Sequence, residues 1–227
     1  MPPGGPTMKR DRRQKAAVAP PMCGAQTERA AETFAAAEGE ADGCRFMRGT
    51  IAGAKHPHPT VANCTFDHVT FVECDFRGIR FTDVRFDHCD LSNLRLDGAA
   101  FCRTEFAGCK LLGASLAEAS LSHVTVSNSN CRYLHLAQGR LKMCRFEECD
   151  LTQAVLTGCR LQGAAFDRCR LAEADFSHTS LQGIDLRSCR IEGLRLHPAD
   201  LRGAIVSTAQ LPDLVPLLGV VADDGYE

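Results

Sequence analysis

The sequence contains no tryptophan and has little net charge, with 26 Lys and Arg against 28 Asp and Glu in 227 residues. No stretch approaches the length of a membrane-spanning helix. No apolar segment of about 7–15 residues follows the basic residues near the N-terminus, so a secretory signal is not predicted. The GxSxG, HExxH, Walker and dinucleotide-binding motifs are all missing. We therefore expect a protein that does not contact membranes, is not an enzyme and holds no cofactor.

What the sequence does contain is a five-residue repeat between Val61 and Leu211. Every fifth residue from Val61 is Leu, Phe, Ile or Val at 30 of 31 positions, and the exception is Cys131. These residues form the large column. The small column lies two residues before each of them, from Cys64 to Ala209, and includes nine Cys and nine Ala. A helix recurs at about 3.6 residues and a half-buried strand at about 2, so neither element explains the pattern.

A period of five closes on itself if each unit makes one short extended side followed by one tight turn. Four sides then form a square coil of 20 residues. Stacked coils would pair as parallel strands about 4.8 Å apart, each burying the face that its neighbour exposes. The position two residues after each large residue is often glycine, as a type II turn with positive φ requires. Where that position holds Asn63, Asn93, Asn128 or Ser188, the residue is compatible with other turns.

Segments such as Ala199-Asp200-Leu201 and Cys74-Asp75-Phe76 resemble the A(D/N)LXX pattern of pentapeptide-repeat proteins, over about two thirds of the chain. The resemblance implies an all-β solenoid, a right-handed quadrilateral β-helix, over residues 44–206 with clean register from Val61. The best-known members, the Qnr and MfpA group, are fluoroquinolone-resistance proteins. They are thought to resemble duplex DNA and to occupy the DNA-binding saddle of DNA gyrase and topoisomerase IV.

Residues 1–43 lie outside the repeat. Met1 to Pro21 is rich in Pro, Gly, Lys and Arg without an apolar period, which predicts a disordered tail. Its basic run is interpreted as solvated in preference to a contact with nucleic acid or a membrane. Thr27 to Glu40 has a helix-forming composition around Phe34, which predicts a short helix over the open end of the solenoid. His56 and His58 are interpreted as loop residues, because two His without a third ligand do not make a metal site.

Residues 207–227 form a different segment after the repeat ends. Pro216 limits any helix there to a short or kinked one, and an open solenoid end needs a covering element. The segment resembles, in place and apolar character, the C-terminal helix through which Qnr and MfpA proteins dimerise. We therefore predict a short helical cap that also forms a homodimer interface. Its predicted interface residues are Leu211, Leu214, Val215, Leu217, Leu218, Val220 and Val221.

Thirteen cysteines would suggest disulfides or metal in other settings. Their positions argue for packing instead, since all but Cys23, Cys102 and Cys131 fall in the small column or its extension to Cys44. Thiols there fit as small apolar core residues with raised pKa values and low reactivity. Free thiols in this number suit a reducing cytoplasm.

The period also assigns charges to faces. The basic face, built on large residues at 20-residue intervals from Val61 to Leu201, carries six Arg and Lys against two Asp. The acidic face, built in the same way from Phe66 to Val206, carries seven carboxylates against four Arg. The carboxylates are the candidate partner-binding residues: Asp67, Asp87, Glu105, Glu147, Glu148, Asp167 and Asp185.

Two functions stay open. The first is a non-enzymatic interaction protein whose rod presents a surface to a protein partner. The second is a DNA-mimicking protein that binds DNA gyrase or topoisomerase IV and protects it from fluoroquinolone-type inhibitors. A DNA mimic should be strongly acidic over a broad surface, but residues 44–211 contain 20 basic and 18 acidic side chains. The charge balance therefore favours the first function, and direct binding of nucleic acid is not expected from either.

Overall fold

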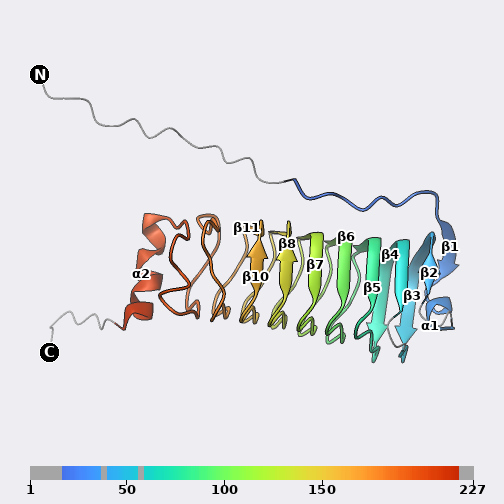
Figure 1. Ribbon diagram of the computed structural model, residues 1–227. Coiled ribbons are helices and arrows are strands. Elements are labelled where there is room, and N and C mark those ends of the chain that lie inside the picture. Colours follow the sequence, from blue (N-terminus) through green and yellow to red (C-terminus); the bar gives the residue numbers. More distant parts are fainter. Residues whose placement is uncertain (1–16, 37–39, 56–58, 220–227) are drawn as a thin grey trace, which may run out of the picture.

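The computed structural model describes residues 17–36, 40–55 and 59–219, which form one long β-solenoid (Figure 1). Its 11 strands belong to a single parallel sheet with the order β1-β3-β4-β5-β6-β7-β8-β10, while β9 pairs with β7 and β11, and β2 with β4. The all-β solenoid predicted from the five-residue period is confirmed. The strands are β1 (Thr27–Ala30), β2 (Ala41–Asp42), β3 (Cys44–Ala52), β4 (Thr60–Val72), β5 (Arg80–Asp87), β6 (Ala100–Ala107), β7 (Ser120–Ser127), β8 (Arg140–Lys142), β9 (Arg145–Glu147), β10 (Arg160–Gln162) and β11 (Ala165–Asp167).

Neighbouring coils pair with a constant offset of 20 residues. Phe66 lies opposite Phe86, and Phe86 lies opposite Phe106. Beyond β11 the same offset continues as single bridges, such as the one between Asp185 and Ile205. Each coil therefore has the four five-residue sides that the sequence predicts.

The turns between sides use positive φ more widely than the sequence indicated. Asn63, Asn93 and Asn128 have φ of 52°, 57° and 49°, so these residues adopt the same left-handed region as the glycines and not other turns. At Gly113 an added Cβ would lie 2.7 Å from Oδ1 of Asn93 in the preceding coil, so glycine leaves room for that side chain. Stacking of the coils thus holds turns with Asn, His, Glu, Arg and Gly in one backbone conformation, whereas Ser188 does not adopt a positive φ.

The core consists of the two inward columns. Phe residues of the acidic face stack directly in register, with ring centroids 5.0 Å apart for Phe66 and Phe86 and 4.8 Å apart for Phe86 and Phe106. Such pairs contribute about 0.5–1.5 kcal/mol beyond the burial of their area. Val126 interrupts this stack, which resumes as a stacked pair at Phe146 and Phe166. Val126 is itself a buried residue of the large column, so apolar side chains from successive coils fill the interior continuously.

The thiols of the small column are buried and hydrogen-bonded. All cysteines in the described part of the chain are free, and all except Cys23 and Cys102 are buried, Cys131 included. Each thiol of this column points toward backbone carbonyls; Cys169, for example, donates to the carbonyl of Phe146, 23 residues earlier, at 3.4 Å. Thr179 occupies an equivalent position and donates to the carbonyl of Leu156 at 2.6 Å. Burial raises the pKa of the Cys64 thiol to about 12.

The N-terminal segment differs from the expected tail and helix. Residues 17–26, which we call the strap, run along the outside of the solenoid from its middle coils back to the first coil, where β1 begins (Figure 1). The amide of Ala19 donates to Nδ1 of His123 at 3.2 Å, and that of Met22 donates to Oδ1 of Asp83 at 2.9 Å. The predicted disorder is therefore wrong for residues 17–21. Residues 1–16, with the basic run, lie outside the described part.

A strand and one short helical turn replace the helix expected over 27–40. β1 pairs in parallel with β3, and among the described residues of this range only α1 (Thr33–Ala36) is helical. The physical reason is that the first coil leaves an edge of unpaired backbone groups, which residues 27–30 satisfy. Phe34, which the sequence placed over the open end, is buried and makes an edge-on contact with Phe46 at 5.5 Å between ring centroids.

The last coil is covered by η1 (Thr208–Gln210), α2 (Leu211–Leu214) and η2 (Val215–Leu218). Gln210 is buried, and its Nε2 donates to the carbonyls of Leu186 and Cys189, each at 2.8 Å. Its Oε1 accepts the backbone N–H of Ser207 at 2.8 Å. One side chain thus satisfies backbone groups that the end of the sheet would leave unpaired. No helix in the described residues is long and apolar enough to cross a membrane.

Candidate interaction surfaces

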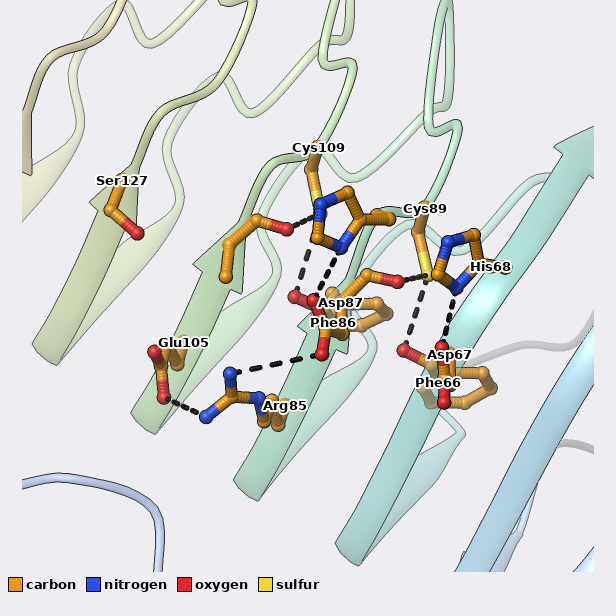
Figure 2. A network of polar contacts seen from close by, with 12 residues as sticks. Phe66, Asp67, His68, Arg85, Phe86, Asp87, Cys89, Glu105, Cys109 and Ser127 are labelled. Carbon is orange, nitrogen blue, oxygen red and sulfur yellow. Dashed lines mark hydrogen bonds and ion pairs between the residues drawn. The ribbon is translucent and has the colours of Figure 1, made fainter.

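The acidic face carries two aspartate–histidine pairs one coil apart (Figure 2). Nδ1 of His68 lies 2.6 Å from Oδ1 of Asp67, and Nδ1 of His88 lies 2.7 Å from Oδ1 of Asp87. The two imidazoles stack with centroids 5.1 Å apart. The next coil has Gly108 at this position, where a Cβ would approach the His88 ring to 2.9 Å. Glycine therefore leaves room for the second ring.

Arginines of the same face compensate its carboxylates. Arg85 lies between Glu105, at 3.1 Å, and Asp87, at 3.8 Å, as Figure 2 shows. His68 first and Arg45 second lower the pKa of Asp67 below its ordinary value. All seven candidate carboxylates are in such pairs: Asp67 with Arg45, Asp87 and Glu105 with Arg85, Glu147 with Arg145, Glu148 and Asp167 with Arg168, and Asp185 with Arg187.

This pairing weakens the field that the acidic face can project. A carboxylate within about 4 Å of a guanidinium is largely neutralised for a partner at a distance. The structure does bring the seven residues onto one face, where Asp67 lies opposite Asp87, and Glu147 lies opposite Asp167. It does not leave them as an uncompensated anionic surface.

The basic face has the opposite property. Its Asp83 is held by Arg103 with two contacts of 2.6 Å, and its Asp200 accepts the backbone N–H of His178 at 3.0 Å. The remaining cations take part in no ion pair within the described ranges of the chain. These unpaired cations are Arg80, Arg140, Lys142, Arg160 and Arg202, all exposed.

An open hollow of about 400 Å³ lies at the edge of the basic face. Glu118, Gln138 and Gly158 line it from one turn column, and Arg140 and Arg160 line it from strands β8 and β10. Reasoning from the sequence sorted the charges by face but did not find this hollow. Its signal was present in the 20-residue spacing of Arg140 and Arg160, which places two like charges side by side.

The C-terminal apolar residues divide into two groups. Leu214 is buried and Leu217 packs against the core, so both cover the rod from which they come. Leu211, Val215 and Leu218 are exposed, by 49%, 38% and 65%. The predicted interface residues Val220 and Val221 lie outside the described part of the chain.

The described residues contain no group of three or more His, Cys, Asp or Glu arranged to hold a metal ion. His56 and His58, which the sequence analysis interpreted as loop residues, lie outside the described ranges.

Comparisons with known proteins find one matching family model and several similar solved structures. The family model described as the pentapeptide repeat region matches residues 79–143, 99–176 and 139–213. No curated protein matches the chain. A trypsin-treated variant of QnrB1, a plasmid-mediated fluoroquinolone resistance protein, is 20% identical over 81% of this chain and 99% of its own, with a TM-score of 0.41. HetL, a pentapeptide repeat protein involved in heterocyst differentiation regulation from the cyanobacterium Nostoc sp. strain PCC 7120, is 15% identical over 77% of this chain and 90% of its own, with a TM-score of 0.29.

Proposed function

The chain belongs to the pentapeptide-repeat family, and we propose that it is a non-enzymatic interaction protein whose rod presents its basic face to a protein partner. The observation that carries this proposal is the uneven distribution of unpaired charge. Five arginines compensate part of the charge of the seven carboxylates on the acidic face, whereas five cations of the basic face take part in no ion pair in the described part of the chain. Complementary charge across an interface directs association and specificity.

Face-specific crosslinking tests the proposal. A photoreactive residue is placed at Lys142 on the basic face, at Glu148 on the acidic face, and at Thr152 and Ala137 on the other two, one at a time in the full chain. We expect one protein to be crosslinked from position 142 in cells and the same protein, once purified, to bind the rod. Equal crosslinking from all four positions would contradict a function in specific recognition.

A second candidate function is binding to DNA gyrase or topoisomerase IV in place of DNA. The in-register carboxylates of the acidic face favour it, because Asp67 and Asp87, and Glu147 and Asp167, repeat at the spacing of the coils, about 4.8 Å. The ion pairs of the same face oppose it. The acidic face is the only candidate for this role, since a surface built for phosphate repels the basic one.

A supercoiling assay with purified gyrase, with and without a fluoroquinolone, decides between the two functions. The test variant reverses Asp87, Glu147, Glu148 and Asp167 to Lys, and each change removes a surface ion pair, which contributes about 0–1 kcal/mol. The DNA-mimic function predicts that the wild-type protein inhibits gyrase or relieves the drug effect, and that the variant does neither. If micromolar wild-type protein leaves gyrase unaffected, the second candidate is eliminated.

The proposal includes a homodimer and a cytoplasmic location. Exposed Leu211, Val215 and Leu218 at the end of the rod support the dimer, because contiguous exposed apolar side chains mark interaction sites. The free cysteines support the location, since oxidising compartments favour disulfides in proteins rich in cysteine.

A further inference from the structure

The strongest unexplained feature is the stack of like charges on the basic face. Arg140 lies directly opposite Arg160 in the parallel ladder, and its neighbour on the other side is Ser120, so no carboxylate is within its register. By contrast, Arg103 meets Asp83 one coil away, and Arg168 meets Glu148. Arg170 also lies opposite an arginine, Arg190, but it meets Asp150 on its other side. Like charges directly opposite each other destabilise a sheet. An anionic partner would therefore remove a cost that the free protein carries.

The hollow beside this stack is open because of its turn residues. Glu118, Gln138 and Gly158 follow one another in successive coils, with φ of 59°, 61° and 66°. The side chain of Gln138 lies over Gly158, where a Cβ would collide with its Nε2. The absence of a side chain at Gly158 thus makes room for the side chain of Gln138, which lines the hollow together with Arg140 and Arg160.

The groups around the hollow select the chemistry of an occupant. Arg140 and Arg160 are suited to bind carboxylates through paired N–H donors. Glu118 takes part in no ion pair within the described residues, and its carboxylate accepts N–H donors. A peptide carries both carboxylates and N–H groups. A nucleic acid would bring its continuous row of phosphates near the carboxylate of Glu118, which repels them.

The spacing of the cations matches an extended peptide. Arg140 and Lys142 are two residues apart on β8, both exposed on either side of buried Leu141. Alternate side chains of an extended strand are also about 6.6–6.8 Å apart. A segment lying along β8 would therefore present two acidic side chains, at positions i and i+2, to these two cations. Arg160 lies one coil further, within reach of the first of them.

We propose that Arg140, Lys142 and Arg160, with the hollow lined by Glu118 and Gln138, are the docking surface for an extended acidic segment of a protein partner. The inference rests on the proposed function and names the chemistry of the partner. It is narrower than that function. If a partner binds another face, the protein is still an interaction protein, but the docking surface proposed here is wrong.

The test measures binding of a fluorescein-labelled peptide with alternating Glu to the full-length protein by fluorescence anisotropy at low salt. A peptide with Gln in place of Glu is the ligand control. The test variant is Arg140→Gln with Arg160→Gln. The protein control is Arg132→Gln with Arg190→Gln, which removes two exposed, unpaired arginines from another face. We expect the test variant to weaken binding at least about tenfold and the control variant to leave it unchanged.

Three results would overturn the proposal. The first is equal binding of the Glu and Gln peptides, or equal loss in both protein variants. The second is tighter binding of a single-stranded DNA 12-mer that depends on Arg140 and Arg160, which would make the surface a nucleic-acid site. The third is an increase of about tenfold in peptide affinity after removal of residues 220–227, which contain Asp223, Asp224 and Glu227. That result would identify the acidic C-terminus of the chain itself as the occupant. The crosslinking experiment remains the separate test of the proposed function.

Discussion

The guanidinium of Arg103 meets the carboxylate of Asp83 across one coil in two parallel contacts of 2.6 Å, Nε to Oδ1 and Nη2 to Oδ2. The same Asp83 accepts the backbone N–H of Met22 at 2.9 Å, and its own carbonyl accepts the thiol of Cys23 at 3.2 Å. Only 8% of the Asp83 side chain is exposed. This ion pair therefore joins two neighbouring coils to the strap.

Replacing Arg103 by Gln should destabilise the protein more than the loss of an exposed ion pair does, because it removes the charged partner of a carboxylate that is only 8% exposed. Chemical denaturation monitored by circular dichroism measures the change. Arg187→Gln is the matched control, since its partner Asp185 is 46% exposed, and exposed pairs contribute about 0–1 kcal/mol. Equal effects of the two changes would contradict the role of Asp83 as a buried anchor.

The same pair predicts a pH dependence. The guanidinium of Arg103 lowers the pKa of Asp83 below its ordinary value. Burial of the carboxylate opposes this shift, and the backbone N–H of Met22 adds to it. A lowered folded-state pKa stabilises the protein above the unfolded value of about 3.9, and this contribution is lost as the pH falls through the folded value. Asp83→Asn tolerates the positive φ at this position and should lose less stability than the wild-type protein between pH 5 and pH 3. If the stability of the wild-type protein and of the Asp83→Asn variant falls equally between pH 5 and pH 3, the prediction is wrong.

The stacked rings predict a strong effect of charge in the core. Phe106→Asp should unfold the neighbouring coils, because it buries an unpaired carboxylate against Phe86. Phe146→Asp should do the same against Phe166. Phe106→Leu keeps an apolar side chain in the column and should cost much less. Thermal unfolding by circular dichroism distinguishes these outcomes, and a wild-type transition in either Asp variant would refute the inward position of the column.

The cysteines should divide sharply in reactivity. In the native protein, Cys23 and Cys102 should react with a thiol reagent, since they are the half-buried ones, while the buried Cys131 should not. Cys149 and Cys169 should also stay unmodified at pH 8, because contacts among neighbouring thiols and burial raise the pKa of each to about 12. Mass spectrometry after brief labelling gives the positions. Rapid modification of Cys149 or Cys169 would contradict the packing role.

The C-terminal residues allow the cap to be separated from the dimer. Leu211→Asp with Leu218→Asp alters exposed positions and should give a folded monomer by sedimentation velocity at micromolar concentration. Leu214→Asp alters the buried cap and should lower the thermal transition instead. A wild-type protein that is monomeric at this concentration would remove the dimer from the proposal.

The sequence predicted the inward columns well because each inward position follows from its place in a strict period. Phe66, Phe86 and Phe106 needed no knowledge of distant contacts to be placed in one stack. The ion pairs were also within reach, since Asp83 and Arg103, or Glu148 and Arg168, are separated by the 20 residues of one coil. Sorting charges by face without matching them across coils gave the acidic face a stronger anionic character than it has, because five arginines pair with its seven carboxylates.

The strap could not be predicted in this way. Ala19 and Met22 contact the rod through backbone N–H groups, which every residue except proline possesses, so their side chains carry no signal. The strand at Thr27–Ala30 was missed for a related reason, because the pairing edge of β3 outweighs local helix preference. In both segments the conformation depends on backbone contacts with the solenoid, which the local sequence of the segment does not indicate.

The segments that cover the two ends of the solenoid contact only its first and last coils, so the number of coils between them can change. Phe34 contacts rings of the first coils, and Gln210 hydrogen-bonds carbonyls of the last ones, whereas the strands between them pair with their neighbours at a fixed 20-residue offset. Duplication of one middle coil, for example residues 140–159, would lengthen the rod by about 4.8 Å without altering either cover. Duplication or deletion of coils in the gene can therefore change the length of the rod without other substitutions. The same changes can be engineered to give rods of chosen length.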